Sequence, residues 1–277
     1  MNKKYFAFFA GLPLLLTGCS KTPGPKKISR YHANGELLQV NTIKYRGNSI
    51  EENVEEFYEE NKVQSTTKTV ATFDGNLIEK ETTFYYNPET KIWGEIYYSY
   101  FAYNSQGRLL SKYETIIGEK GELPFSFQLF RYDEYGRETA NEMYDYFNNQ
   151  FFLFTKIETE YNQKGQKSKE YQYSNIAGNY ELSCYYVYNY EQNGALNNVS
   201  EFDSKNKLVS VNRYEYNEKT LSPLSMTIYR LENNQELPRI RYDYEYNSKN
   251  EKTKESYSLY DDEAKKFVLD EYTVFQY

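Results

Sequence analysis

A tyrosine followed four residues later by a glycine, with a polar turn between them, recurs along this chain of 277 residues. The segments are YHANG (31–35), YNSQG (103–107), YDEYG (132–136), YNQKG (161–165) and YEQNG (190–194). Tyr103, Tyr132, Tyr161 and Tyr190 stand 29 residues apart each time. A fixed period of this length indicates a repeat array, in which each unit is one small structural motif.

The turn chemistry predicts β-hairpins. Asn or Asp in the first turn position and Gly in the fourth are typical of a type I turn closed by a glycine bulge. Gly35, Gly107, Gly136, Gly165 and Gly194 are therefore expected to be left-handed. In YNSKN (246–250) and FDSKN (202–206), Asn250 and Asn206 replace the glycine, and asparagine tolerates that conformation best among the other residues.

YNEKT (216–220) should form a different turn, because Thr220 is β-branched and is strained at positive φ. A second, more variable turn falls midway between the regular ones, as at Gly118 to Gly121 and at Asn148 and Asn149. Each repeat of about 29 residues thus contributes two strands.

Aromatic residues alternate with other residues between the turns, as at Tyr186, Tyr188 and Tyr190. This period of two is that of half-buried antiparallel strands. We expect an all-β fold with about 14 to 16 strands, an extended and twisted antiparallel β-meander. A closed β-barrel is the alternative, which pairing of the first and last strands would establish.

Composition supports an aromatic core. The mean hydropathy of −0.88 and 26% charged residues are typical of disordered chains, but 33 tyrosines and 17 phenylalanines are not. The net charge of −7 indicates no excess of basic residues that could bind phosphates, so nucleic acid is not an expected partner.

The N-terminus carries a secretory signal. An apolar run from Tyr5 to Leu16 follows Lys3 and Lys4, and it ends in LTGC (16–19). This motif resembles the lipobox of bacterial lipoproteins, which implies removal of residues 1–18 and attachment of diacylglycerol and a further acyl chain such as palmitate at Cys19. The run is too short for a membrane span, and more than one acyl chain gives stable anchoring.

Residues 19–27 then form a lipidated tether rich in proline, and residues 28–277 form the repeat domain. Within that domain, Ser49 to Glu60 departs from the repeat. Ser49 and Glu52 have capping-box spacing, and Val54, Phe57 and Tyr58 lie at helical spacing. We expect a short helix over 49–60, with an acidic loop or an irregular strand as the alternative.

YDEYGRE (132–138) and YNSQGRL (103–109) resemble YD repeats, the tyrosine and aspartate repeats of bacterial polymorphic-toxin shells. With the lipobox, the chain looks like the tyrosine-rich envelope lipoproteins of Gram-negative bacteria, especially Bacteroidota. The resemblance implies an outer-membrane location, on either the periplasmic or the cell-surface side. It carries over no activity.

No residue pattern indicates catalysis, a cofactor or a metal. His32 is the only histidine, and the glycines recur at hairpin spacing instead of preceding helices. Trp93 is the best single candidate for an exposed ligand-binding ring. We expect a binding or adhesion module for a glycan or an envelope protein. The alternatives are a structural or assembly component of the envelope, and then a glycoside hydrolase, since 40 acidic residues can supply a carboxylate pair.

Overall fold

The computed structural model describes residues 23–277 except 177, 178 and 234. It consists of 18 antiparallel strands in a single sheet. The strands are β1 (Lys27–His32), β2 (Leu37–Arg46), β3 (Ser49–Glu59), β4 (Lys62–Asp74), β5 (Leu77–Asn87), β6 (Ile92–Tyr103), β7 (Leu109–Gly118), β8 (Gly121–Tyr132), β9 (Glu138–Phe147), β10 (Gln150–Tyr161), β11 (Lys167–Ile176), β12 (Asn179–Tyr190), β13 (Leu196–Asp203), β14 (Leu208–Tyr216), β15 (Pro223–Glu232), β16 (Gln235–Tyr246), β17 (Lys252–Asp261) and β18 (Lys266–Gln276).

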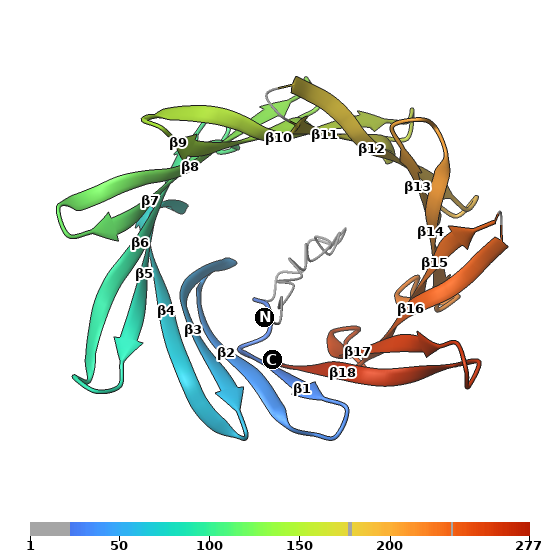
Figure 1. The fold of residues 1–277 in the computed structure, drawn as a ribbon, viewed down its shortest axis with the longest axis horizontal. Coiled ribbons are helices and arrows are strands. Elements are labelled where there is room, and N and C mark those ends of the chain that lie inside the picture. The colour runs from blue at the N-terminus through green and yellow to red at the C-terminus, as the bar shows by residue number, and fades with distance from the viewer. Residues whose placement is uncertain (1–22, 177–178, 234) are drawn as a thin grey trace.

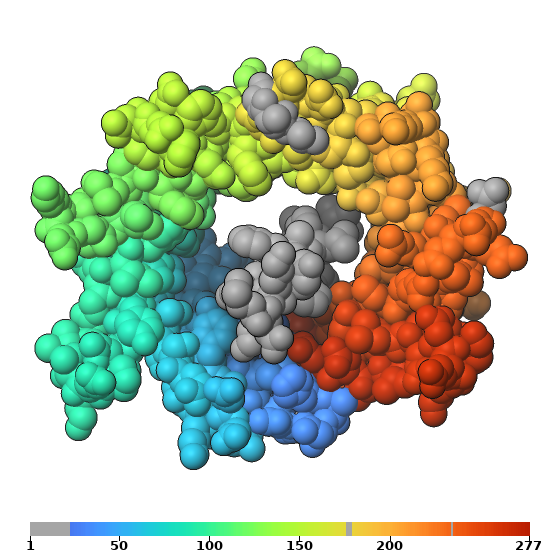
Figure 2. Space-filling model, in the orientation of Figure 1, coloured from blue at the N-terminus to red at the C-terminus, as the bar shows by residue number. Residues whose placement is uncertain are grey.

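The sheet closes on itself. β1 pairs with β2 and also with β18, where Ser29 lies opposite Val274 and Tyr31 opposite Tyr272. Figure 1 shows the resulting ring, and the described side chains leave an opening at its centre in Figure 2. The fold is therefore a closed β-barrel, and the expected open meander is wrong. Closure pairs the backbone groups that an open sheet leaves free at its two edges.

The hairpin turns divide into two sets at opposite ends of the barrel. One end, which we call the ladder end because its turns bond to one another in series, carries eight turns. These turns follow Tyr45, Phe73, Tyr103, Tyr132, Tyr161, Tyr190, Tyr216 and Tyr246. The far end carries the more variable turns between β1 and β2, β3 and β4, and so on to β17 and β18. β18 runs toward the ladder end, so Gln276 and its partner Lys27 both lie there.

Each regular turn has the predicted geometry. Gly107, Gly136, Gly165 and Gly194 have φ between 75° and 89°. The strand register shifts by one residue immediately before each of their tyrosines, as the glycine bulge requires. Asn206 and Asn250 take the same conformation, with φ of 63° and 62°, and both predictions are confirmed.

The turn after Tyr216 also differs as predicted. Thr220 is not left-handed, and Leu221 takes positive φ at 54° instead. The turn is one residue longer, because the amide of Leu221 donates to the carbonyl of Asn217 and the amide of Asn217 donates to the carbonyl of Ser222.

The helix expected over 49–60 is wrong, because residues 49–59 form β3. This segment pairs with β2 on one side and β4 on the other, so its backbone groups bond to two neighbours. Its apolar spacing also fits a strand, since Val54 and Tyr58 share one face while Phe57 lies on the other. Lys44 pairs with Glu52 across the β2–β3 hairpin at 2.5 Å and offsets part of the acidic run.

Small residues fill the tightest positions of the sheet. Val40, Ala71, Ala140, Val199, Val211 and Met226 are among the buried apolar residues, and Ser99, Thr115 and Ser225 among the buried polar ones. Most of the described tyrosines surround them as half-buried rings, as the composition predicts, whereas a few such as Tyr135 are exposed.

Candidate functional site: the turn ladder, an aromatic cluster and the apolar hairpins

The regular turns stack on one another along the ladder end. The hydroxyl of Tyr132 donates to the carbonyl of Leu109 at 2.8 Å, and that of Tyr161 donates to the carbonyl of Glu138 at 2.7 Å. Each tyrosine thus bonds the start of the strand that follows the preceding turn. The hydroxyl of Tyr45 likewise donates to the carbonyl of Pro25 at 3.1 Å, and this bond holds the N-terminal segment at the ladder end.

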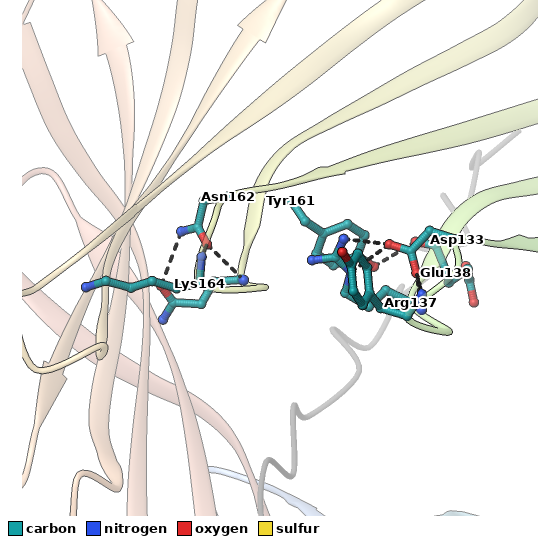
Figure 3. Close-up of polar contacts among 8 residues, drawn as sticks. Asp133, Arg137, Glu138, Tyr161, Asn162 and Lys164 are labelled. Carbon is teal, nitrogen blue, oxygen red and sulfur yellow. Dashed lines mark hydrogen bonds and ion pairs between the residues drawn. The ribbon is translucent and has the colours of Figure 1, made fainter.

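The residue after each glycine completes the ladder (Figure 3). Arg137 pairs with Asp133 of its own turn at 2.6 Å and places its guanidinium 4.5 Å from the ring centre of Tyr161 in the next repeat. Gln166 donates to the carbonyl of Gly194 at 3.0 Å. Partial desolvation acts to raise the pKa of Asp133, but the backbone amide and guanidinium of Arg137 outweigh this effect and lower that pKa. These contacts are internal to the sheet, so the turn residues serve as scaffold.

Tyr31 and Gly35 belong to the far end, away from the other four turns that run from a tyrosine to a glycine. Gly35 has the expected φ of 88°, but the ring of Tyr31 stacks on Tyr272 of β18 at 5.0 Å instead of reaching a neighbouring turn. The repeat is thus out of phase in the first hairpin. Tyr45, which precedes Arg46 and Gly47, occupies the ladder position there.

Trp93 lies in β6 next to the far-end turn, where it is half-buried. Its ring packs against Tyr86 at 5.2 Å, and the ammonium of Lys68 lies 4.8 Å from its centre. These neighbours limit access to the ring. Cys19 lies outside the described residues, so its lipidation stays a prediction.

A larger aromatic surface joins five neighbouring strands. The aromatic cluster consists of Tyr98, Tyr100, Tyr113, Phe127, Tyr144, Tyr146 and Phe151, whose successive ring centres lie 5.0 to 6.2 Å apart. These residues share one face of the sheet, because Tyr100 is opposite Tyr113, Tyr113 opposite Phe127, and Phe127 opposite Tyr144. Such cross-strand aromatic pairs each contribute about 0.2 to 1 kcal/mol.

Carboxylates bind the hydroxyls of this cluster. Glu122 accepts from Tyr100 at 2.9 Å and from Thr115 at 3.1 Å, and the buried Glu142 accepts from Tyr144 at 2.9 Å. Burial, followed by the hydrogen bond to Glu122, raises the pKa of Tyr100 to about 12. The Tyr100 hydroxyl is therefore a neutral donor at physiological pH, and the cluster combines apolar rings with polar groups.

A carboxylate pair occupies the opposite face of the same strands. Glu81 and Glu114 lie on either side of Ser99 in the strand register. Burial raises the pKa of Glu81. Burial also acts to raise the pKa of Glu114, but hydrogen bonds from Lys112, Ser126 and Tyr97 outweigh this effect and lower that pKa. Divergent pKa values are also typical of acid–base pairs. Here Lys112 and Ser126 engage Glu114 directly, so the residues form a network within the sheet.

The hairpins β7–β8 and β9–β10 expose a concentration of apolar side chains at the far end. Phe147 is 67% exposed, Phe154 54%, Phe125 50% and Leu123 49%, and Ile116 and Phe152 are also exposed. We call these six residues the apolar hairpin surface. In Figure 1 the two hairpins project outward from the ring. Individual exposed apolar residues are ordinary, and their number on these two neighbouring hairpins makes the surface a candidate interaction site.

The sequence pattern alone does not reveal this surface or the aromatic cluster, because the residues of each come from several strands. The available signal was the run Phe151, Phe152 and Phe154 beside a variable turn, which exceeds what one buried face can accept.

Within the described residues, no three or more His, Cys, Asp or Glu side chains gather to hold a metal ion. The same residues contain no helix long and apolar enough to cross a membrane.

Comparison with known proteins assigns no family. No protein-family model matches the chain, and no curated protein matches it. Three solved structures illustrate its similarity. A porin-like protein from Bacteroides uniformis is 9% identical, with 92% of this chain and 98% of that chain covered and a TM-score of 0.46. A protein of unknown function from Bacteroides fragilis is 13% identical over 45% of this chain and 93% of that chain, with a TM-score of 0.39.

The Tc holotoxin pore of Photorhabdus luminescens is 12% identical, with 89% of this chain covered and a TM-score of 0.40. The alignment spans only 15% of that toxin chain. Two of these structures are Bacteroides proteins and the third is a bacterial toxin. At such identities and TM-scores the similarity assigns no activity.

Proposed function

We propose that this protein is a structural or assembly component of a Gram-negative cell envelope, held at the outer membrane by a lipid on Cys19. It acts as a rigid ring that holds a protein partner. The proposal includes no catalytic role, cofactor or nucleic-acid partner.

The closed ring with exposed apolar hairpins is the observation that carries this proposal. Every described strand pairs on both sides, so no sheet edge is free to take up a partner strand. A partner must therefore bind through side chains. The tyrosine ladder holds neighbouring hairpins in fixed positions, and such preorganisation reduces the entropic cost of binding.

Crosslinking in intact cells followed by purification from membranes tests the proposal. We expect a second envelope protein to co-purify at constant stoichiometry. A monodisperse lipoprotein without a partner, both before and after crosslinking, would contradict it.

A binding or adhesion module for a glycan is the second candidate, and the aromatic cluster favours it. Ring faces stack on sugars, and Glu122 and Glu142 offer acceptors beside them. Here the test is retention of the purified domain on a glycan panel, with Tyr113→Ala as the variant. Retention that the variant abolishes would support a glycan ligand, whereas no retention by the native domain would exclude it.

A further inference from the structure

Six tyrosines of β12, β14 and β16 have hydroxyls that the sheet does not use. We call them the free-hydroxyl tyrosines, and they are Tyr188, Tyr190, Tyr214, Tyr242, Tyr244 and Tyr246. Among the described residues, none of these hydroxyls has a hydrogen-bond partner, and none of their oxygens is buried. Each hydroxyl is therefore open to solvent and able to bond a ligand.

Other tyrosines of the sheet differ in this respect. The hydroxyl of Tyr161 in the ladder is bonded to the carbonyl of Glu138, and that of Tyr100 in the aromatic cluster is bonded to Glu122. Those hydroxyls contribute to the fold, whereas the six free ones do not.

The free-hydroxyl tyrosines form one surface. Tyr188 and Tyr214 share a face through the pairing of β12, β13 and β14, and Tyr214 and Tyr242 share it through the pairing of β14, β15 and β16. Burial raises the pKa of Tyr244, and the nearby Tyr214 and Tyr242 raise it further. Burial likewise raises the pKa of Tyr242 to about 12. These phenols are neutral at physiological pH, so each oxygen both donates and accepts hydrogen bonds.

A hollow of about 570 Å³ continues this surface toward the far end. Ile228, Ile240 and Leu259 line it and lie opposite one another, on the face that carries Tyr242. Because the sheet curves around a ring, a hollow across neighbouring strands lies on the concave side, which faces the opening in Figure 2. Its volume is that of a small-ligand site.

The chemistry of this surface favours a sugar chain. An acyl chain would leave the hydroxyls without partners, and this is costly. An extended peptide satisfies its backbone by joining the edge of a sheet, and every described strand is already paired on both sides. Sugar hydroxyls both donate and accept, and the C–H faces of sugars stack on aromatic rings.

We infer that the free-hydroxyl tyrosines bind an extended glycan inside the ring. This site is separate from the aromatic cluster, which lies on the opposite face of the sheet. It also does not depend on the protein partner of the proposed function.

Calorimetric titration of the full lipidated chain, in a detergent without sugar groups, tests the inference. The probes are maltohexaose, cellohexaose, chitohexaose and hexagalacturonate. Tyr214→Phe combined with Tyr244→Phe removes two free hydroxyls and keeps both rings. Tyr161→Phe is the matched control, because it removes a hydroxyl that is already bonded within the sheet.

We expect at least one hexasaccharide to bind, and the double variant to weaken that binding about tenfold. The double variant should keep the native urea midpoint, since its two hydroxyls bond no other described residue. Tyr161→Phe should do the opposite, with a lower midpoint and native affinity.

No binding by the native chain to any of the four sugars, or native affinity in the double variant, would overturn the inference. Binding that Tyr113→Ala abolishes and the double variant retains would assign the glycan to the aromatic cluster and would also overturn it. These outcomes leave the proposed protein partner untouched, because crosslinking in intact cells tests that partner separately.

Discussion

The conformation of the turn glycines predicts a stability difference that a single substitution can measure. Gly165 has φ of 78°, and the nearest atom to a Cβ built there is a nitrogen of Arg137 at 3.6 Å. Space is thus available, and only the backbone is strained. For Gly165→Ala we expect a loss of about 1 to 2 kcal/mol, the cost of a left-handed alanine.

The matched control is Gly94→Ala in β6. Gly94 does not have left-handed φ, and nothing lies within 4 Å of its Cβ position. Alanine there should be neutral or stabilise by about 0.5 to 1 kcal/mol, since glycine is unfavourable inside a strand. Gly165→Asn should cost less than Gly165→Ala, because Asn206 and Asn250 adopt this conformation naturally.

Urea unfolding of the domain provides the assay. The predicted loss for Gly165→Ala lowers the midpoint without changing the slope, and it corresponds to a melting temperature about 2 to 8 °C lower. Equal midpoints for Gly165→Ala, Gly165→Asn and the native protein would refute the argument that backbone geometry selects glycine in the ladder.

Three further outcomes are expected. Tyr161→Phe removes the donor to the carbonyl of Glu138 and should cost about 1 kcal/mol in the same urea assay; an unchanged midpoint would count against the ladder bond. Burial raises the pKa of Tyr100 to about 12 from its ordinary 10.0, so its contribution to stability is complete below pH 10 and is lost as the pH rises toward 12; ultraviolet titration should show delayed ionisation, which Tyr100→Phe reduces. Metabolic labelling with a fatty acid should be abolished by Cys19→Ala and retained by Cys184→Ala, and the reverse result would disprove the lipobox assignment.

The local turns could be predicted from sequence because their causes are local. Glycine or asparagine at the fourth position, and the exclusion of Thr220, follow from the φ preference of single residues. The out-of-phase turn at Tyr31 could not be predicted in this way. Its motif has the same chemistry as the others, and the alternation of turns along the antiparallel strands places it at the far end.

Closure and the interaction surfaces depend on contacts that are distant in sequence. Residues 49–59 carry both a helical and an alternating pattern, and pairing with β2 and β4 selects the strand. The aromatic cluster joins Tyr98 to Phe151 through rings on intervening strands, so no local spacing reveals it. The number of strands was underestimated in part because residues 49–59, which were expected to be helical, form β3.

A disulfide between the first and last strands can show whether the ring is closed. Ser29 lies opposite Val274, so Ser29→Cys and Val274→Cys are combined with Cys184→Ser. The control combines Lys254→Cys with Val274→Cys, since these residues are opposite one another in the β17–β18 hairpin. We predict that mild oxidation links both pairs to a similar extent in the folded protein. Crosslinking of the hairpin control while positions 29 and 274 stay reduced would show an open sheet and contradict the barrel.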